Sequence, residues 1–194
     1  MVLKGLIADP NNAGLHVDRA NLLYIQGRLD EAVAEAERAL ALDSTMVKAD
    51  ANLGLDYLNL GQFEKSLEFF DNAIHLSPHD PDLAGWYSGK ASAYFGLNRY
   101  DQAIEWARRA IAINPNHDVF AHVRLIAALA LSGYESEAHE ALQRYLSRPT
   151  TEPKTIAAWK VLRARFVNER SDPRFLELSD RGIEGLRKAG MPEE

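Results

Sequence analysis

The chain repeats one helical pattern three times, at intervals of about 34 residues. In the first occurrence, Asp30–Leu42, small or apolar residues fall at i, i+1, i+4, i+7 and i+8, which is one face of an α-helix. The same spacing returns in residues 66–74 and 103–111, and the glycines that precede the first two occurrences, Gly27 and Gly61, are 34 residues apart. Nowhere does the sequence show the sustained period-2 alternation that marks a strand. A period of this length, with two helices in each period, predicts an all-α helical solenoid.

The second unit carries the most complete set of motif residues, which are Leu53, Gly54, Tyr57, Gly61, Phe63, Phe70, Ala73 and Pro78. This set resembles the tetratricopeptide (TPR) repeat, whose pattern is W-x2-L-G-x2-Y, followed by A-x3-F and a closing P. Asp50 stands in place of the tryptophan, and Ser66 replaces the first alanine of the second helix. The resemblance covers about residues 13–150 and implies a TPR-type solenoid, a right-handed superhelix of antiparallel helix pairs.

The resemblance divides the chain into four units between two different ends. The expected repeats are residues 13–46, 47–80, 84–117 and 119–152, of which the last is degenerate. Residues 1–12 fit the end of a preceding repeat, which predicts that the chain starts inside a repeat; a native N-terminal cap is the alternative. Residues 153–194 are expected to form a C-terminal capping helix pair, made of helices over 155–169 and 172–190. Asp172 is the expected N-cap of the second of these helices, and Pro173 is its expected first residue.

The last twelve residues, IEGLRKAGMPEE, resemble the closing segment of TPR regions attached to bacterial class III nucleotide cyclases and related multidomain regulators. This likeness implies a bacterial protein. It also gives an alternative function, as a regulatory or oligomerising region of a larger bacterial signalling enzyme.

Composition excludes several classes of protein. The net charge of −6 is not the basic footprint of a nucleic-acid binder. The chain has no cysteine, so a disulfide framework, a thiolate zinc site and a cysteine nucleophile are all excluded. No apolar run approaches the roughly 20 residues that cross a bilayer. We therefore expect a cytoplasmic protein that binds neither nucleic acid nor membrane.

The sequence shows no convergent set of catalytic or metal-binding residues. It has no Walker-type glycine loop, dinucleotide fingerprint, His-Glu-x-x-His helix or Gly-x-Ser-x-Gly elbow. Among its six histidines, His75 and His79 are separated by Pro78, and His117 and His122 are five residues apart, on different sides of a helix. We therefore expect a protein that is not an enzyme and that holds neither a cofactor nor a metal.

The TPR family places certain positions on the first helix of each unit in a concave groove. Two asparagines, Asn21 and Asn52, also match those of the family's carboxylate clamp, which grips the acidic C-terminal tail of chaperones. The candidate peptide-binding groove implied by the resemblance consists of Val17, Asn21, Tyr24, Asn52, Leu55, Leu58, Ser92, Phe95, Phe120 and Val123.

A carboxylate clamp also needs lysine or arginine, because the carboxylates of the ligand must be paired with donors. The matching basic positions hold Val17, Gly85 and Gly89. We therefore predict that the groove is apolar and is not a clamp for acidic tails.

Three occupants fit such an apolar channel. A protein or peptide partner can supply an amphipathic helix or an extended apolar segment. The C-terminal helix, with Phe175, Leu176, Ile183 and Leu186, can fold back and fill the channel. A second copy of the chain can do the same from outside, which makes a homo-oligomer through exposed terminal or concave surfaces possible. The sequence predicts a non-catalytic scaffold that binds a protein or peptide, and leaves these alternatives open.

Overall fold

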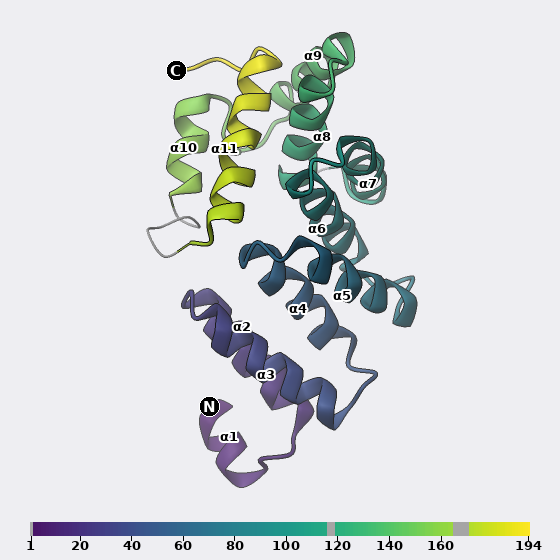
Figure 1. Ribbon diagram of the computed structural model, residues 1–194, viewed down its shortest axis with the longest axis vertical. Coiled ribbons are helices and arrows are strands. Elements are labelled where there is room, and N and C mark those ends of the chain that lie inside the picture. Colours follow the sequence, from purple (N-terminus) through teal and green to yellow (C-terminus); the bar gives the residue numbers. More distant parts are fainter. Residues whose placement is uncertain (1, 116–118, 165–170) are drawn as a thin grey trace.

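Figure 1 shows the protein as a computed structural model that describes residues 2–115, 119–164 and 171–194. All regular elements in these ranges are α-helices. In chain order they are α1 (Val2–Ala8), α2 (Ala13–Ile25), α3 (Leu29–Leu42), α4 (Val47–Asn59), α5 (Phe63–Leu76), α6 (Leu83–Gly96), α7 (Tyr100–Ile113), α8 (Val119–Leu131), α9 (Glu135–Leu146), α10 (Ile156–Arg163) and α11 (Pro173–Lys188). The all-α prediction is confirmed. Position 117, where the third expected unit ends and His117 stands, and residues 165–169 of the expected helix 155–169 lie outside the described residues.

Helices α2 to α9 form four consecutive pairs, and the same turn joins the two helices of each pair. One residue of each turn has a positive φ, namely Gly27, Gly61, Asn98 and Gly133. The next residue donates its N–H to a carbonyl five positions back, as Arg28 does to Leu23 at 2.9 Å and Arg99 does to Tyr94 at 2.9 Å. This is the Schellman arrangement, which caps the first helix with a left-handed residue. Asparagine tolerates that conformation better than other residues with a side chain, so the third unit makes the turn without glycine.

The pairs stack so that their first helices lie inside and their second helices lie outside. The first helices, α2, α4, α6 and α8, contact one another in succession, and each of the second helices α3, α5 and α7 packs against the first helix of the next pair. We call the surface formed by α2, α4, α6 and α8 the inner face. This arrangement is a helical solenoid, as the sequence predicts.

Phe70 holds two pairs together. It is fully buried, and its ring lies against the backbones of α4 and α6 at Gly54 and Gly89. A Cβ atom on Gly89 would lie 2.3 Å from the ring, so only glycine fits there. The nearby Ser66, which replaces the alanine of the family pattern, donates its hydroxyl to the carbonyl of Gly54 at 2.7 Å. A buried hydroxyl therefore finds a partner, and the substitution is tolerated.

The C-terminal helix α11 lies on the inner face, against α8 and α6 (Figure 1). Its first turn is capped as predicted: the Asp172 side chain accepts the N–H of Arg174 at 2.8 Å, and Pro173 is the first helical residue. Behind it, the chain's last residues close the α10–α11 hairpin. The N–H groups of Ile156 and Ala157, at the start of α10, donate to the carbonyls of Pro192 and Glu193 at 2.8 and 3.0 Å.

The contact between Phe70 and α6 yields a test with a matched control one turn away. Gly89→Ala forces a Cβ into the Phe70 ring and should lower the free energy of unfolding by about 1–3 kcal/mol. Gly85→Ala on the same helix meets nothing within 4 Å. It should be neutral or stabilise by up to about 1 kcal/mol, because alanine favours helix over glycine. Urea unfolding followed by circular dichroism measures both variants, and equal effects of the two substitutions would contradict the packing described.

Candidate functional site

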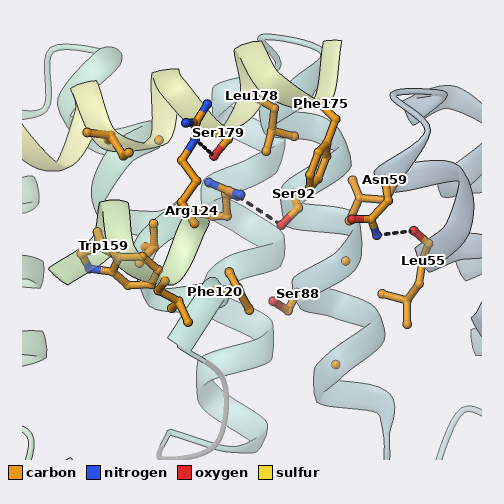
Figure 2. A pocket seen from close by; sticks show the side chains of 18 of the residues that line it. Leu55, Asn59, Ser88, Ser92, Phe120, Arg124, Trp159, Phe175, Leu178 and Ser179 are labelled. Carbon is orange, nitrogen blue, oxygen red and sulfur yellow. Dashed lines mark hydrogen bonds between the residues drawn. The ribbon is translucent and has the colours of Figure 1, made fainter. Parts of the chain in front are cut away.

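A cavity of about 310 Å³ lies between the inner face and the α10–α11 hairpin (Figure 2). Six helices contribute to its walls. The lining residues are Tyr24 from α2; Leu55, Leu58 and Asn59 from α4; Gly85, Ser88, Gly89 and Ser92 from α6; Phe120, Val123 and Arg124 from α8; Trp159, Leu162 and Arg163 from α10; and Phe175, Leu178, Ser179, Gly182, Ile183 and Leu186 from α11.

The cavity exists because the inner side of α6 has no large side chains. Gly85, Ser88, Gly89 and Ser92 follow one another at i, i+3, i+4 and i+7, so they share one face of the helix. A Cβ atom on Gly85 would meet nothing within 4 Å. The helix backbone therefore forms a bare floor, and larger side chains from neighbouring helices surround it.

Those surrounding side chains are mostly apolar. Figure 2 shows Leu55 on one side of the cavity and Trp159 on the other. The rings of Phe120 and Trp159 meet edge to face with their centroids 6.3 Å apart. Leu55 and Phe120 are 37% and 39% exposed. Because these two side chains remain partly in solvent, the cavity offers apolar surface that a ligand can still cover.

A few polar side chains interrupt this apolar lining. The Nε of Arg124 donates to the hydroxyl of Ser92 at 3.2 Å. The Nε of Arg163 donates to the hydroxyl of Ser179 at 2.7 Å, and its Nη2 pairs with Asp180 at 2.6 Å. These bonds fix both guanidinium groups within the walls.

Across the cavity, the side-chain amide of Asn59 donates to the carbonyl of Leu55 at 2.8 Å and to the hydroxyl of Tyr24 at 3.3 Å. The described lining residues include no aspartate or glutamate. The site is therefore a mainly apolar chamber in which Arg124, Arg163 and Asn59 are held by intramolecular bonds, which suits binding by shape and burial of apolar surface.

The structure brings together six of the ten residues that the sequence places in a groove. Tyr24, Leu55, Leu58, Ser92, Phe120 and Val123 line the cavity. Asn21 is exposed on α2 and Asn52 is partly buried on α4, and neither lines the cavity.

The other two expected groove residues lie in the core instead. Val17 is 3% exposed and packs with Ala39 and Ala49, because α2 turns this residue toward the next helices of the stack. Phe95 is fully buried beneath two guanidinium groups, those of Arg124 at 5.2 Å and Arg181 at 5.7 Å from the ring centroid. Arg181 comes from α11, so the C-terminal helix covers a residue that the repeat register alone leaves open.

The C-terminal helix contributes more of the cavity wall than any repeat helix. Phe175, Ile183 and Leu186, which the sequence nominates as possible fillers of the channel, line the cavity, whereas Leu176 does not. Sequence reasoning missed Arg124 and Arg163. Their positions are not among those that face the groove in the family, and their pairing with Ser92 and Ser179 depends on where the hairpin lies.

The contacts of His16, the arrangement of possible metal ligands and the length and apolar character of the helices bear on other possible functions. His16 is held between the carboxylate of Glu35 at 2.6 Å and the carbonyl of Pro10 at 2.9 Å, an arrangement that joins α2 to α3. In the described ranges, no three histidine or acidic side chains are grouped as metal ligands. In the same ranges, no helix combines the length and the apolar character needed to span a membrane.

A buried carboxyl group stands behind the α4 wall of the cavity. Asp56 is 1% exposed, and its Oδ2 has no hydrogen-bond partner. Burial raises the pKa of Asp56 to about 7, because the ionised form loses its hydration. Burial also raises the pKa of the Tyr24 hydroxyl, and the negative charge of ionised Asp56 raises this pKa further.

This carboxyl predicts a pH dependence of stability. The native state holds the Asp56 proton more tightly than the unfolded chain, so its contribution to stability is complete below about pH 4 and is lost as the pH rises to about 7. Asp56→Asn removes this loss. The difference in free energy of unfolding between the variant and the wild type should rise in favour of the variant by about 2–3 kcal/mol from pH 5 to pH 8. Urea unfolding at a series of pH values measures it, with Asp18→Asn as a control for the loss of one charge; a constant difference would contradict the assignment.

Comparisons with known proteins agree with this architecture. Two family models, both described as tetratricopeptide repeat, match residues 4–47 and 44–116 and together span more than half of the chain. The chain is 32% identical to Small glutamine-rich tetratricopeptide repeat-containing protein 2 of Mycosarcoma maydis over 115 residues, which are 59% of this chain and 28% of that protein. It is 26% identical to Hsp70-Hsp90 organizing protein 3 of Arabidopsis thaliana over 112 residues, which are 58% of this chain and 20% of that protein. The chain thus spans less than a third of the length of either relative.

Among solved structures, YrrB, described as a TPR protein with an unusual peptide-binding site, aligns with a TM-score of 0.67. The alignment covers 97% of this chain and 95% of YrrB, at 20% sequence identity, and it therefore speaks to the fold alone. The family matches, the repeated left-handed turn and the stacked helix pairs lead to one conclusion: this chain belongs to the tetratricopeptide repeat family.

Proposed function

We propose that this chain is a non-catalytic interaction scaffold that binds an apolar or amphipathic segment of a protein partner in the cavity on its inner face. TPR proteins mediate protein–protein interactions, and their fold is typically non-catalytic. The observation that supports the proposal is the apolar chamber over the bare floor of α6, with Leu55 and Phe120 partly exposed at its walls. Its volume lies at the lower end of the range of about 300–1,000 Å³ that ligand pockets occupy.

The kind of ligand follows from what replaces the clamp cations. One relative is an Hsp70-Hsp90 organizing protein, so an acidic chaperone tail is a natural candidate. In this chain the three matching positions are the buried Val17 and two glycines of the cavity floor, Gly85 and Gly89. Two of the cations that would pair with a terminal carboxylate are thus replaced by glycines that leave space in the cavity, and the third is replaced by a valine of the core. We infer an apolar ligand for this reason.

Exposed apolar side chains next to the chamber support a ligand longer than a single anchor. Leu22 and Ile25, one turn apart on α2, are 47% and 80% exposed. Tyr24, between them in sequence, lines the cavity. A partner segment that enters the chamber with one large side chain has further apolar surface to cover along α2, and burial of such surface is the main driving force for association. The sequence-based link to nucleotide-cyclase TPR regions stays a prediction, since neither relative named above is a cyclase.

The proposal is tested by placing a charge in the chamber and, separately, on an equally exposed leucine elsewhere. Leu55→Glu puts a carboxylate on the cavity wall and should reduce capture of the partner from the source cell at least tenfold, because the charge must be desolvated on binding. Leu76→Glu is the control: Leu76 is 40% exposed at the end of α5 and does not line the cavity.

Both variants should keep the helical circular dichroism of the wild type. Unchanged capture by Leu55→Glu, or equal losses from the two variants, would place the binding surface elsewhere. Light scattering of the purified protein separates a partner from a second copy of the chain as the occupant: concentration-dependent dimers that Leu55→Glu abolishes would identify self-association.

A further inference from the structure

The helix α11 sits on the inner face in the way that a bound amphipathic helix would. The residues that it turns toward the cavity fall at i, i+3, i+4, i+7, i+8 and i+11: Phe175, Leu178, Ser179, Gly182, Ile183 and Leu186. The opposite side is charged and exposed, with Glu177, Asp180, Glu184, Arg187 and Lys188. Recognition of a helix in a groove uses this division into one buried apolar stripe and one solvated face.

Contacts at both ends and at the middle show that α11 spans three repeats. Its first turn meets the turn after α4, where a Cβ on Gly61 would lie 2.3 Å from the Asp172 carboxylate. Its middle meets the end of α6, where Arg181 donates to the carbonyl of Gly96 at 2.9 Å. In its second half, Gly182 and Gly185 lie against Arg124 and Ala127 of α8. One helix therefore covers the same stretch of inner face that a ligand helix of similar length would need.

We propose that α11 is an intramolecular occupant of the ligand groove, and that the partner's binding segment is an amphipathic helix of the same kind, which replaces it. This inference rests on the proposed function and names the class of ligand: a helix with an apolar stripe and with small residues at two positions three apart.

The requirement for small residues comes from the close approach of α11 to α8. A Cβ atom on Gly185 would lie 2.6 Å from the Cα of Ala127, so the two backbones are nearly in contact. A Cβ atom on Gly182 would lie 2.7 Å from Nη1 of Arg124, at the movable end of a long side chain. A replacing helix at the same depth thus needs glycine at the position of Gly185 and tolerates alanine or serine at that of Gly182.

The contact of α11 with the inner face leaves hydrogen-bond donors unsatisfied, which favours its replacement by a ligand helix. Arg181 is largely buried, yet its Nε and Nη1 have no hydrogen-bond partner, and the nearest carboxylate oxygen, on Glu177, is 3.8 Å from Nε. Buried donors without acceptors destabilise the state that contains them. A ligand helix with an apolar residue at this position would cover Phe95 without that cost. Removal of α11 would also open Phe95, which the repeat register assigns to the groove.

The other helix of the hairpin, α10, has anchors on α9 in addition to its contacts with α11. The hydroxyl of Tyr145, on α9, donates to the carbonyl of Pro153 at 2.6 Å, and Lys154 donates to the carbonyl of Tyr145 at 2.7 Å. Ile156, at the start of α10, is fully buried. Because α10 remains tethered, α11 competes at a high effective concentration, and the wild type should bind a free helix weakly.

The test uses the full chain and a fluorescent synthetic peptide with the sequence of residues 172–190. Gly185→Leu in the protein drives a side chain into the backbone of α8 and should release α11. The peptide, which keeps its glycines, should then bind the vacated groove at least tenfold more tightly than it binds the wild type, as measured by fluorescence anisotropy. Glu184→Leu is the matched control, because it introduces the same side chain on the exposed face one residue away. A peptide with Gly182 and Gly185 replaced by leucine should not bind.

Equal affinity of the peptide for wild type and Gly185→Leu, or binding to neither, would overturn the inference. Should Gly185→Leu lose the helical signal of the whole chain, Leu178→Glu, at a residue 1% exposed, gives the same test from the apolar stripe. Global unfolding of both variants would also overturn it, since α11 would then be an inseparable part of the core. Peptide binding does not depend on the natural partner. A failure here, with partner capture still lost in Leu55→Glu, would remove this inference and leave the proposed function standing.

Discussion

The contact of Phe70 with the backbones of α4 and α6 is the packing interaction on which the rest of the structure depends. It requires glycine at positions 54 and 89, and Gly89 belongs to the same run of small residues that forms the cavity floor. Gly89 therefore serves both the packing between repeats and the bare inner side of α6. Because Gly89 must leave room for the Phe70 ring, it has no side chain that could fill the cavity. The solenoid then has a hollow at its centre, which another helix must cover or a ligand must occupy.

The fold could be predicted because each of its determinants is local and repeated. Helix periodicity and the left-handed turn residue recur every 34 residues or so, and the same physical solution is reached each time. The repeat pattern accepts more than one residue at the turn, since Asn98 adopts the left-handed conformation that glycine adopts in the other units. Residues 172–190 were also predictable as a helix, with its N-cap at Asp172, because capping chemistry lies within a few residues of sequence.

Within the repeats, the site was predictable only where the repeat register alone decides it. Leu55 and Phe120 line the cavity because their register positions point inward, and nothing else covers them completely. Phe95 has an equivalent register position, but a long-range contact with Arg181 of α11 buries it. The sequence has no periodic pattern that predicts where α11 docks. It also has none that predicts the hydrogen bond from Arg181 to the carbonyl of Gly96. Val17 differs for another reason: it packs against Ala39 of α3 and Ala49 of α4, in the core between the first two helix pairs.

A helix held inside its own groove sets how strongly a partner must bind. The replaced helix and the replacing helix bury similar apolar stripes, so the area of the stripe contributes little to the difference between the two states. What remains are the terms in which the two helices differ: the unsatisfied donors of Arg181, the depth of approach permitted at Gly185, and the concentration advantage of a tethered segment. A partner helix with an apolar residue in place of Arg181 avoids the cost of the unsatisfied donors. A partner helix without glycine at the position of Gly185 cannot approach α8 closely enough to bind. Specificity in such a groove is therefore set less by the exposed leucines than by Arg181 and Gly185 of α11. A competing helix has to improve on the unsatisfied donors of Arg181, and it has to reproduce the glycine at position 185.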